Sequence, residues 1–329
     1  MIEVNNLVKK YGSHLAVDHL SFQVEPGKIY GFLGPNGAGK STTMNIMTGY
    51  IAPTEGTVMI NGYDIVKDPE EAKKCIGYLP EIPPLYPEMT VKEYLKFVAE
   101  LKKIKGKEKE AQIREVMDMT MITDMSERLI RNLSKGYKQR VGLAQAILGY
   151  PEVIILDEPT VGLDPKQIIE IRELIKKLSE KHTIILSSHI LSEVQAVCDE
   201  IMIISKGKLV ACDTPEGLTS LMNGSATLEV HILGEQGKAE RVITKVPGIL
   251  HYSISQSHEK NCIKAEIETD AKEDIRVGLF YALAEEKMPI LSMNRLEKSL
   301  EDIFLELTGD EKQTQNNMQE GEDSNESNI

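Results

Sequence analysis

The residues from Gly34 to Thr42 have the types and spacing that bind phosphate, because they satisfy the pattern G-x-x-x-x-G-K-[ST]. Glycines at this spacing let successive backbone N–H groups curl around a phosphate chain at the start of a helix, where the helix dipole favours anions. Lys40 is expected to reach the β- and γ-phosphates, and the Ser41 hydroxyl is expected to bind Mg²⁺. We therefore predict a nucleoside triphosphate site made of Gly34, Pro35, Asn36, Gly37, Ala38, Gly39, Lys40, Ser41 and Thr42.

Two adjacent acidic residues end a short apolar run later in the chain. Val153–Leu156 is apolar throughout and is followed directly by Asp157 and Glu158. A carboxylate at the end of a buried strand is well placed to hold Mg²⁺, directly or through water, and we assign this role to Asp157. Glu158 points elsewhere and is the natural general base to orient the attacking water. The pair predicts hydrolysis of the bound triphosphate.

Four apolar runs predict the strands that must position these groups. They are Ile29–Leu33, Val153–Leu156, Thr183–Leu186 and Ile201–Ile204. Strands that are apolar on both faces are typical of an α/β sheet covered by helices, and the phosphate loop lies between the first strand and a helical stretch at Thr42–Met47. From about residue 80 to residue 148 the pattern changes to helices. The sequence thus predicts an α/β domain over residues 1–221 with a helical insertion.

Residues 222–309 are predicted to form a small C-terminal α+β domain. Strand-like and helical segments follow one another in the order β-α-β-β-α-β, which fits a ferredoxin-like unit with one extra helix at Leu296–Leu307. Residues 310–329 are mostly Asn, Gln, Ser and acids, with almost nothing apolar. Such a segment cannot bury enough surface to offset the entropy of ordering, so we expect a disordered acidic tail.

The composition narrows the class of protein further. The chain has 329 residues, with 38 Lys+Arg against 51 Asp+Glu, and its formal net charge is −13. A strongly negative protein repels phosphate backbones, so nucleic acid is not an expected partner. Apolar runs fall far short of the roughly 18 residues that a membrane helix needs. The four cysteines lie far apart with no C-x-x-C pair, which argues against a zinc site or a disulfide framework.

Further motifs identify the kind of triphosphatase. Leu133-Ser-Lys-Gly-Tyr-Lys-Gln-Arg140 precedes the acidic pair, Gly162-Leu-Asp-Pro165 follows it, and Ser187-Ser-His189 ends the next apolar run. In this order and spacing, residues 1–220 resemble the ATP-binding subunit of ABC transporters. The resemblance implies a P-loop NTPase (ABC ATPase) fold, ATP and Mg²⁺ as cofactors, and two subunits that close around two ATP molecules.

The resemblance also implies roles for individual residues. Tyr11 matches the aromatic side chain that stacks on adenine. Ser134 and Gly136 match the signature positions that contact the γ-phosphate bound by the opposite subunit, and Asp164 matches the D-loop aspartate at the dimer interface. His189 matches the catalytic histidine that hydrogen-bonds the γ-phosphate. Charge spread over a γ-phosphoryl group needs donors from several sides, which only a pair of subunits supplies in full.

Two departures from the family pattern indicate a particular subgroup of the family. The signature is usually L-S-G-G-Q, whereas Lys135 and Tyr137 here change the surface offered to the partner subunit at the dimer interface. The family's Q-loop glutamine is replaced by Glu81, whose carboxylate can bind Mg²⁺ or orient water. These variants, with the ending Leu300–Gly309, resemble bacterial ATPases that serve ABC-2 type exporters of the gliding-motility and drug-export branches. That subgroup implies two partners, a polytopic ABC-2 type permease and a second ATPase subunit that we expect to be identical. It also implies that the protein is cytoplasmic and peripheral on the inner face of the cell membrane.

Two other functions remain open from the sequence alone. A soluble ABC ATPase of translation or DNA repair usually carries two cassettes, coiled-coil insertions, zinc modules or basic extensions, and this chain shows one cassette and an acidic tail. A nucleotide-sensing regulator without turnover conflicts with the intact Glu158 and His189.

Three features outside the motifs complete the sequence analysis. The basic run Lys102–Lys109 is either a solvated loop or a contact to lipid headgroups. The segment Ile82–Pro87 is apolar and stiffened by prolines, so its side chains Leu85 and Tyr86 either fill the domain core or dock the permease. His14 shows no ligand spacing, and we assign it no role.

Overall fold

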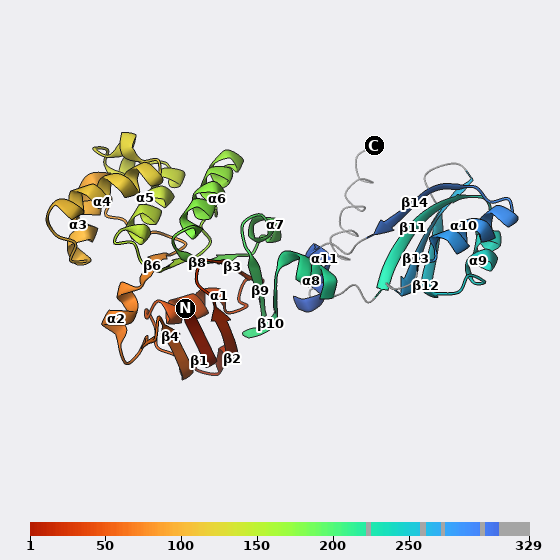
Figure 1. Cartoon of the computed structure of the whole chain (residues 1–329), viewed down its shortest axis with the longest axis horizontal. Coiled ribbons are helices and arrows are strands. Elements are labelled where there is room, and N and C mark those ends of the chain that lie inside the picture. The colour runs from red at the N-terminus through yellow and green to blue at the C-terminus, as the bar shows by residue number, and fades with distance from the viewer. Residues whose placement is uncertain (222–224, 257–260, 271–273, 297–299, 309–329) are drawn as a thin grey trace, which may run out of the picture. The chain divides into compact units, whose positions relative to one another are not determined.

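A six-stranded sheet forms the centre of the first part of the chain (Figure 1). The computed structural model describes residues 1–329 except 222–224, 257–260, 271–273, 297–299 and 309–329. The strands lie in the order β10-β9-β3-β8-β7-β6. All neighbours pair in parallel except β10, which is antiparallel to β9. The bounds are β3 Ile29–Leu33, β6 Ile76–Leu79, β7 Val153–Leu156, β8 Thr183–Ser188, β9 Glu200–Ser205 and β10 Lys208–Asp213.

The four apolar runs named in the sequence are all strands of this sheet. Every residue of β3, β7 and β8 is buried, as expected for strands covered on both faces. Because parallel strands end at the same edge, the residues that follow β3, β7 and β8 come together there. The α/β fold with a P-loop between β3 and the first helix is therefore confirmed.

A second sheet of four antiparallel strands was not predicted. It has the order β2-β1-β4-β5 and comprises β1 (Ile2–Tyr11), β2 (His14–Val24), β4 (Glu55–Ile60) and β5 (Tyr63–Asp64). In β2 the residues Leu20, Phe22 and Val24 are buried while the residues between them are exposed, which is the alternation of a strand with one face on the core. The ring of Phe22 packs edge to face on Phe32 of β3, with centroids 5.2 Å apart, so the two sheets share one core.

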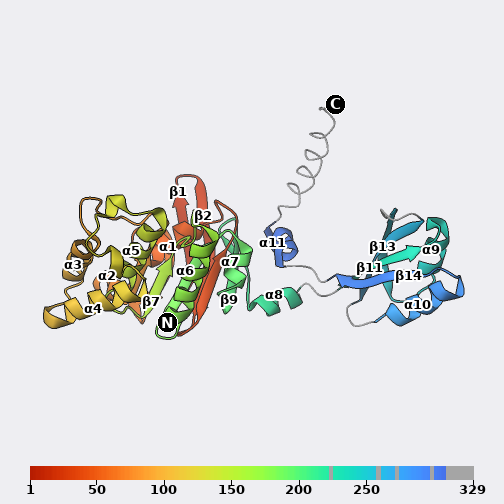
Figure 2. The ribbon, with the colours of Figure 1, turned by 90° about the horizontal axis from the view of Figure 1, so that it is seen from above.

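Helices surround the central sheet, and most of those between residues 80 and 148 gather at one side of it. In both views α3 and α4 lie on the side of the sheet opposite β9 (Figure 1 and Figure 2). The helix α3 begins with a capping box, in which the side chains of Thr90 and Glu93 each accept the other residue's backbone N–H. The bounds are α1 Lys40–Met47, α2 Pro69–Lys74, α3 Val91–Leu101, α4 Gly106–Met119, α5 Lys135–Ile147, α6 Pro165–Ser179 and α7 Leu191–Gln195, with short 3₁₀ turns at Thr123–Met125 and Ile130–Asn132.

Contacts divide the described chain into two compact units, residues 1–215 together with 306–308, and residues 216–305. The second unit has a four-stranded antiparallel sheet of order β12-β13-β11-β14. Alternate residues of β11 and β13 are buried with residues of α9 and α10, so both helices cover the same face of this sheet. The elements that follow β10 along the chain are α8 Pro215–Leu221, β11 Ser225–Leu233, α9 Gln236–Ile243, β12 Ile249–Gln256, β13 Cys262–Asp270, α10 Arg276–Glu285, β14 Ile290–Leu296 and α11 Leu300–Thr308.

One predicted helix boundary is wrong, and other predictions concern residues that the structure does not describe. The last helix begins at Leu300, not at Leu296, because Leu296 is the final residue of β14. The predicted boundaries next to residues 222 and 309, and the predicted acidic tail 310–329, lie outside the described residues. Among the described residues, no helix combines the length and apolar character needed to cross a membrane.

Candidate active site

The phosphate loop lines a cavity of about 360 Å³ at the edge where the central strands end. Two of its glycines are required by close approach of the backbone. A Cβ on Gly34 would lie 2.3 Å from the carbonyl oxygen of Ile204, and a Cβ on Gly39 would lie 2.5 Å from that of Ala16. Gly39 also has φ +103°, a left-handed conformation that favours glycine. The loop can therefore wrap tightly in front of α1, and Asn36, Gly37, Ala38, Gly39, Lys40, Ser41 and Thr42 all line the cavity.

Lys40 folds back over this loop. Its side chain is buried, and its Nζ donates to the carbonyl oxygens of Gly34 at 2.6 Å and Pro35 at 3.3 Å. Burial lowers the pKa of the Lys40 ammonium, and the nearby carboxylates Glu158 and Asp157 partly oppose this shift. A cation held in a loop of backbone N–H groups is suited to a polyphosphate, which would replace the two carbonyl contacts.

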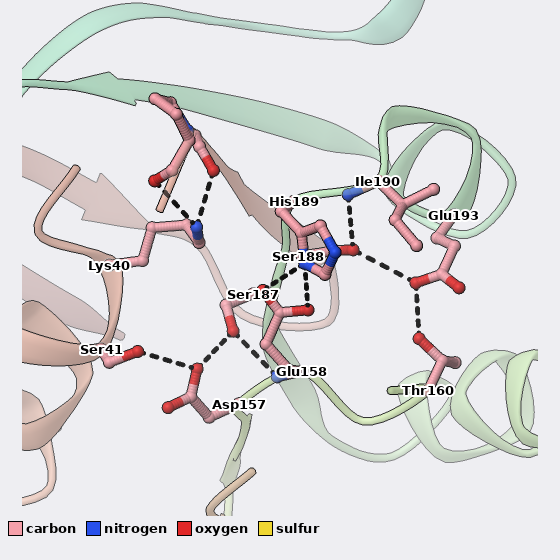
Figure 3. Close-up of polar contacts among 12 residues, drawn as sticks. Lys40, Ser41, Asp157, Glu158, Thr160, Ser187, Ser188, His189, Ile190 and Glu193 are labelled. Atoms are coloured by element: carbon pink, nitrogen blue, oxygen red, sulfur yellow. Dashed lines mark hydrogen bonds and ion pairs between the residues drawn. The ribbon is translucent and has the colours of Figure 1, made fainter. Parts of the chain in front are cut away.

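Asp157 and Glu158 follow β7 and are held by a serine at the end of β8 (Figure 3). The Ser187 hydroxyl donates to Asp157 Oδ1 at 2.5 Å and accepts the backbone N–H of Glu158 at 2.9 Å. The Ser41 hydroxyl lies 3.5 Å from the same Asp157 oxygen. One hydroxyl thus fixes the positions of both acids, and it brings Asp157 next to the phosphate loop.

Glu158 and His189 form the second part of the site. The Nδ1 atom of His189 lies 3.0 Å from each carboxylate oxygen of Glu158. Glu158 has φ +48°, which is uncommon for a residue with a side chain and carries a conformational cost. Because the backbone turns sharply at this residue, its side chain faces the cavity and not the core, and both Glu158 and His189 line the cavity.

The remaining predicted residues divide into two groups. Tyr11 and Glu81 line the same cavity as the phosphate loop. Ser134, Lys135, Gly136 and Asp164 do not line it. Instead, Ser134 caps α5 and Asp164 caps α6, each by accepting a backbone N–H of the first helical turn. These two helix starts are adjacent, since a Cβ on Gly136 would lie 2.4 Å from the Gln167 side chain, and one on Gly162 would lie 2.0 Å from Lys135 Nζ.

Several residues of the cavity were not predicted from the sequence. His14, to which we assigned no role, lines it together with Ala16 and Val161. His14 could have been predicted, because it pairs with Tyr11 across the tight turn between β1 and β2 and therefore lies next to the predicted adenine-stacking residue. Ser187 was quoted only as part of the motif ending in His189, and its contact with Asp157 depends on the pairing of β7 with β8.

The donors at this site fit a magnesium ion that accompanies a triphosphate. Mg²⁺ prefers oxygen ligands and is usually bound by one or two carboxylates together with substrate phosphates. Ser41 and Asp157 present such oxygens 3.5 Å apart at the start of α1, and Glu81 adds a carboxylate to the cavity wall.

Comparisons with known proteins agree with this geometry. Residues 17–161 match the family described as ABC transporter. The chain is 38% identical over 311 residues to the bacitracin transport ATP-binding protein BcrA of Bacillus licheniformis, covering 94% of this chain and 97% of that protein. It is 33% identical over 310 residues to the linearmycin resistance ATP-binding protein LnrL of Bacillus subtilis, and the match covers 94% of this chain and 98% of LnrL.

Solved structures show the same fold over about two thirds of the chain. An ATP-binding subunit of an ABC transporter superposes with a TM-score of 0.62 at 32% identity, covering 67% of this chain and 92% of that one. The cassette MJ0796, described as a dimeric post-hydrolysis state bound to ADP and Pi, superposes with a TM-score of 0.60 at 27% identity. The match covers 65% of this chain and 98% of the cassette.

Fold and site together define a P-loop ATPase. Within that class, the chain belongs to the ATP-binding proteins of ABC transporters. The alternative of a soluble translation or repair ATPase is not supported, because these full-length relatives are ATP-binding proteins of transport and drug resistance.

Proposed function

We propose that this chain is the ATP-hydrolysing subunit of an exporter, in which two copies close around two ATP molecules and drive a separate ABC-2 type permease. The observation that carries the proposal is that Lys40, Glu158 and His189 line one cavity, with the Asp157 carboxylate 3.5 Å from the Ser41 hydroxyl beside it. The names of BcrA and LnrL, which refer to bacitracin transport and linearmycin resistance, support export of a drug-like substrate.

In this proposal each group at the cavity has one task. The loop N–H groups and Lys40 bind the phosphates, and the ring of Tyr11 stacks on adenine. Ser41 and Asp157 hold Mg²⁺, with Glu81 as a further oxygen donor; the ion would neutralise charge on the phosphates.

The chemical step depends on two further side chains. Glu158 orients the attacking water and accepts its proton. His189 holds that carboxylate through the contact at Nδ1, while its ring faces the same cavity as the γ-phosphate. Hydrolysis then requires donors on the far side of the γ-phosphate, which the cavity of one subunit does not contribute by itself.

The second subunit supplies those donors in our proposal. Ser134, Lys135, Gly136 and Asp164 lie at the adjacent starts of α5 and α6, outside the cavity of their own subunit. Ser134 and Gly136 would contact the γ-phosphate of the opposite subunit, while Lys135 and Asp164 would lie in the interface. The dimeric MJ0796 cassette supports this assembly, and we propose a homodimer.

We further propose that the permease docks on the helical part of residues 1–221. A second cavity, of about 510 Å³, is lined by Tyr50, Tyr78, Ile82 and Pro84 among others. Ile82 is 82% exposed, and exposed apolar groups of this kind mark docking surfaces. Docking there would place the protein on the inner face of the membrane, with residues 222–309 as a separate α+β domain.

ATPase measurements test the proposal directly. The purified chain should hydrolyse ATP only when Mg²⁺ is present, and ATP should shift Glu158→Gln protein to twice its mass in size-exclusion chromatography. Nucleotide binding without hydrolysis, with or without the co-expressed permease, would instead identify a nucleotide sensor.

A further inference from the structure

A large cavity lined by lysines lies outside the active site. Its volume is about 690 Å³, and five lysines and two glutamates line it in a chain whose net charge is −13. The lysines come from the end of α2, from the end of α3 and from the turn that leads into α4. They are Lys73, Lys74, Lys102, Lys103 and Lys105.

Three of these lysines have free ammonium groups. Lys74 is paired with Glu71 at 2.5 Å, and Lys102 Nζ donates to carbonyl oxygens at the end of α5. Lys73, Lys103 and Lys105 have no side-chain hydrogen bond or ion pair with any residue that the structure describes. The lining has more lysines than glutamates, and like charges held together repel one another, so an anion that binds between the free lysines is stabilised.

Two other groups in the wall favour a particular kind of anion. The helix α4 starts at this cavity, and the side chain of its N-cap residue, Lys105, makes no capping hydrogen bond, so backbone N–H groups remain for an acceptor. Gln112 is only 7% exposed, and its Oε1 has no hydrogen-bond partner within the described parts of the chain. A phosphate that carries a hydroxyl group would satisfy both the donors and this acceptor.

The position of the cavity indicates where such a phosphate comes from. Ile76 and Lys102 line both this cavity and the groove to which we assign the permease, so the two are adjacent. Leu101, which is 66% exposed, also lines the lysine cavity. An exposed leucine beside free lysines is suited to the boundary between headgroups and acyl chains.

We infer that this cavity binds the headgroup of an anionic phospholipid, such as phosphatidylglycerol, at the membrane surface beside the permease. The inference rests on the proposed function for the orientation of the subunit, but lipid binding itself needs neither ATP nor permease. It gives the subunit a membrane contact of its own, which holds the adjacent groove close to the permease.

Vesicle flotation of the full chain tests this inference. The protein should float with phosphatidylcholine vesicles that contain phosphatidylglycerol and stay behind with pure phosphatidylcholine. Changing Lys103→Glu together with Lys105→Glu should lower the bound fraction at least about tenfold, since each lysine near an anionic surface contributes roughly fivefold. The matched control is Lys177→Glu with Lys181→Glu, which makes the same charge change away from this cavity and should bind like the unchanged protein.

Three outcomes would overturn the inference: no flotation of the unchanged protein at low salt, equal loss in both double variants, or complete displacement by soluble glycerol phosphate. The last would assign the cavity to a soluble anion. ATP binding by each variant, measured in the same preparations, reports on folding and on the proposed function separately, because none of these lysines lines the nucleotide cavity.

Discussion

The Nδ1 atom of His189 lies 3.0 Å from both carboxylate oxygens of Glu158. The histidine side chain is 43% exposed and the glutamate side chain only 10%, so the imidazole covers the carboxylate on its open side. The backbone N–H of Glu158 donates to the Ser187 hydroxyl at 2.9 Å. The carboxylate is therefore fixed in orientation before any nucleotide enters.

Replacing Glu158 with glutamine should separate binding from hydrolysis. The amide keeps the size of the side chain but cannot accept a proton, and general-base catalysis typically contributes about 10² to 10⁴ in rate. Turnover should fall by that order in a steady-state ATPase assay, while ATP affinity measured by calorimetry stays within about twofold of the original. A variant with normal turnover would remove Glu158 from the catalytic role.

His189→Ala should lower kcat more than it raises KM, because the lost contact is to Glu158. The chain offers a control in His14, which lines the same cavity but makes no hydrogen bond or ion pair with Glu158 in the described structure. His14→Ala should change mainly the apparent affinity for ATP, since His14 lies beside Tyr11 at the expected base end of the site. If the two variants show the same split between kcat and KM, the proposed role of His189 is wrong.

Ser187→Ala should weaken the binding of Mg²⁺ by the enzyme. The hydroxyl orients Asp157, and loss of a group that orients a metal ligand typically costs about 10- to 100-fold in metal affinity. The Mg²⁺ concentration for half-maximal rate should rise by at least about tenfold. Ser188→Ala is the neighbouring control, because Ser188 contacts Glu193 and not Asp157. Equal Mg²⁺ requirements in the two variants would contradict the assignment.

Local motifs and long-range pairing explain what the sequence could and could not predict. The phosphate loop and the acids after β7 were predictable because each depends on a short apolar strand and the residues directly after it. The sheet of β1, β2, β4 and β5 was missed because Ile2 pairs with Ile60, a contact that no local pattern encodes. The role of Ser187 could not be predicted for the same reason, because its partner Asp157 is 30 residues away in the sequence. His14 was within reach, since it faces Tyr11 across a tight turn.

Lys40→Ala should abolish most ATP binding, in contrast to Glu158→Gln. Removing the ammonium deletes the only lysine side chain in the cavity wall among the described residues and leaves the carbonyls of Gly34 and Pro35 without their donor. Charge-assisted hydrogen bonds contribute about 1.5–3 kcal/mol each, so affinity should fall by at least about tenfold. Isothermal titration with ATP in the presence of Mg²⁺ measures this directly; an unchanged dissociation constant would contradict the role.

The last prediction concerns the side chain on which docking of the permease depends. The sequence points to Leu85 and Tyr86. In the structure Leu85 is half-buried, and Tyr86, which is 51% exposed, packs its ring edge to face on Phe97 with centroids 5.4 Å apart. Ile82 is 82% exposed and lines the groove of about 510 Å³. We therefore expect Ile82→Glu to release the protein from membranes of cells that co-express the permease, because a charge in an apolar docking groove must be desolvated without a partner.

Ile169→Glu is the matched control for this prediction, since Ile169 is 55% exposed on α6 and lies outside the groove. It should remain with the membrane fraction, and both variants should bind ATP like the unchanged chain. Tyr86→Glu should instead lower the melting temperature, because it breaks a ring contact within the helical part. Binding of Ile82→Glu to permease-free anionic vesicles should be unchanged, which separates docking on the permease from contact with lipid. If the Ile82→Glu protein stays with the permease-containing membranes but no longer binds anionic vesicles, the groove would be the lipid site and the lysine cavity the permease site, contrary to our assignment.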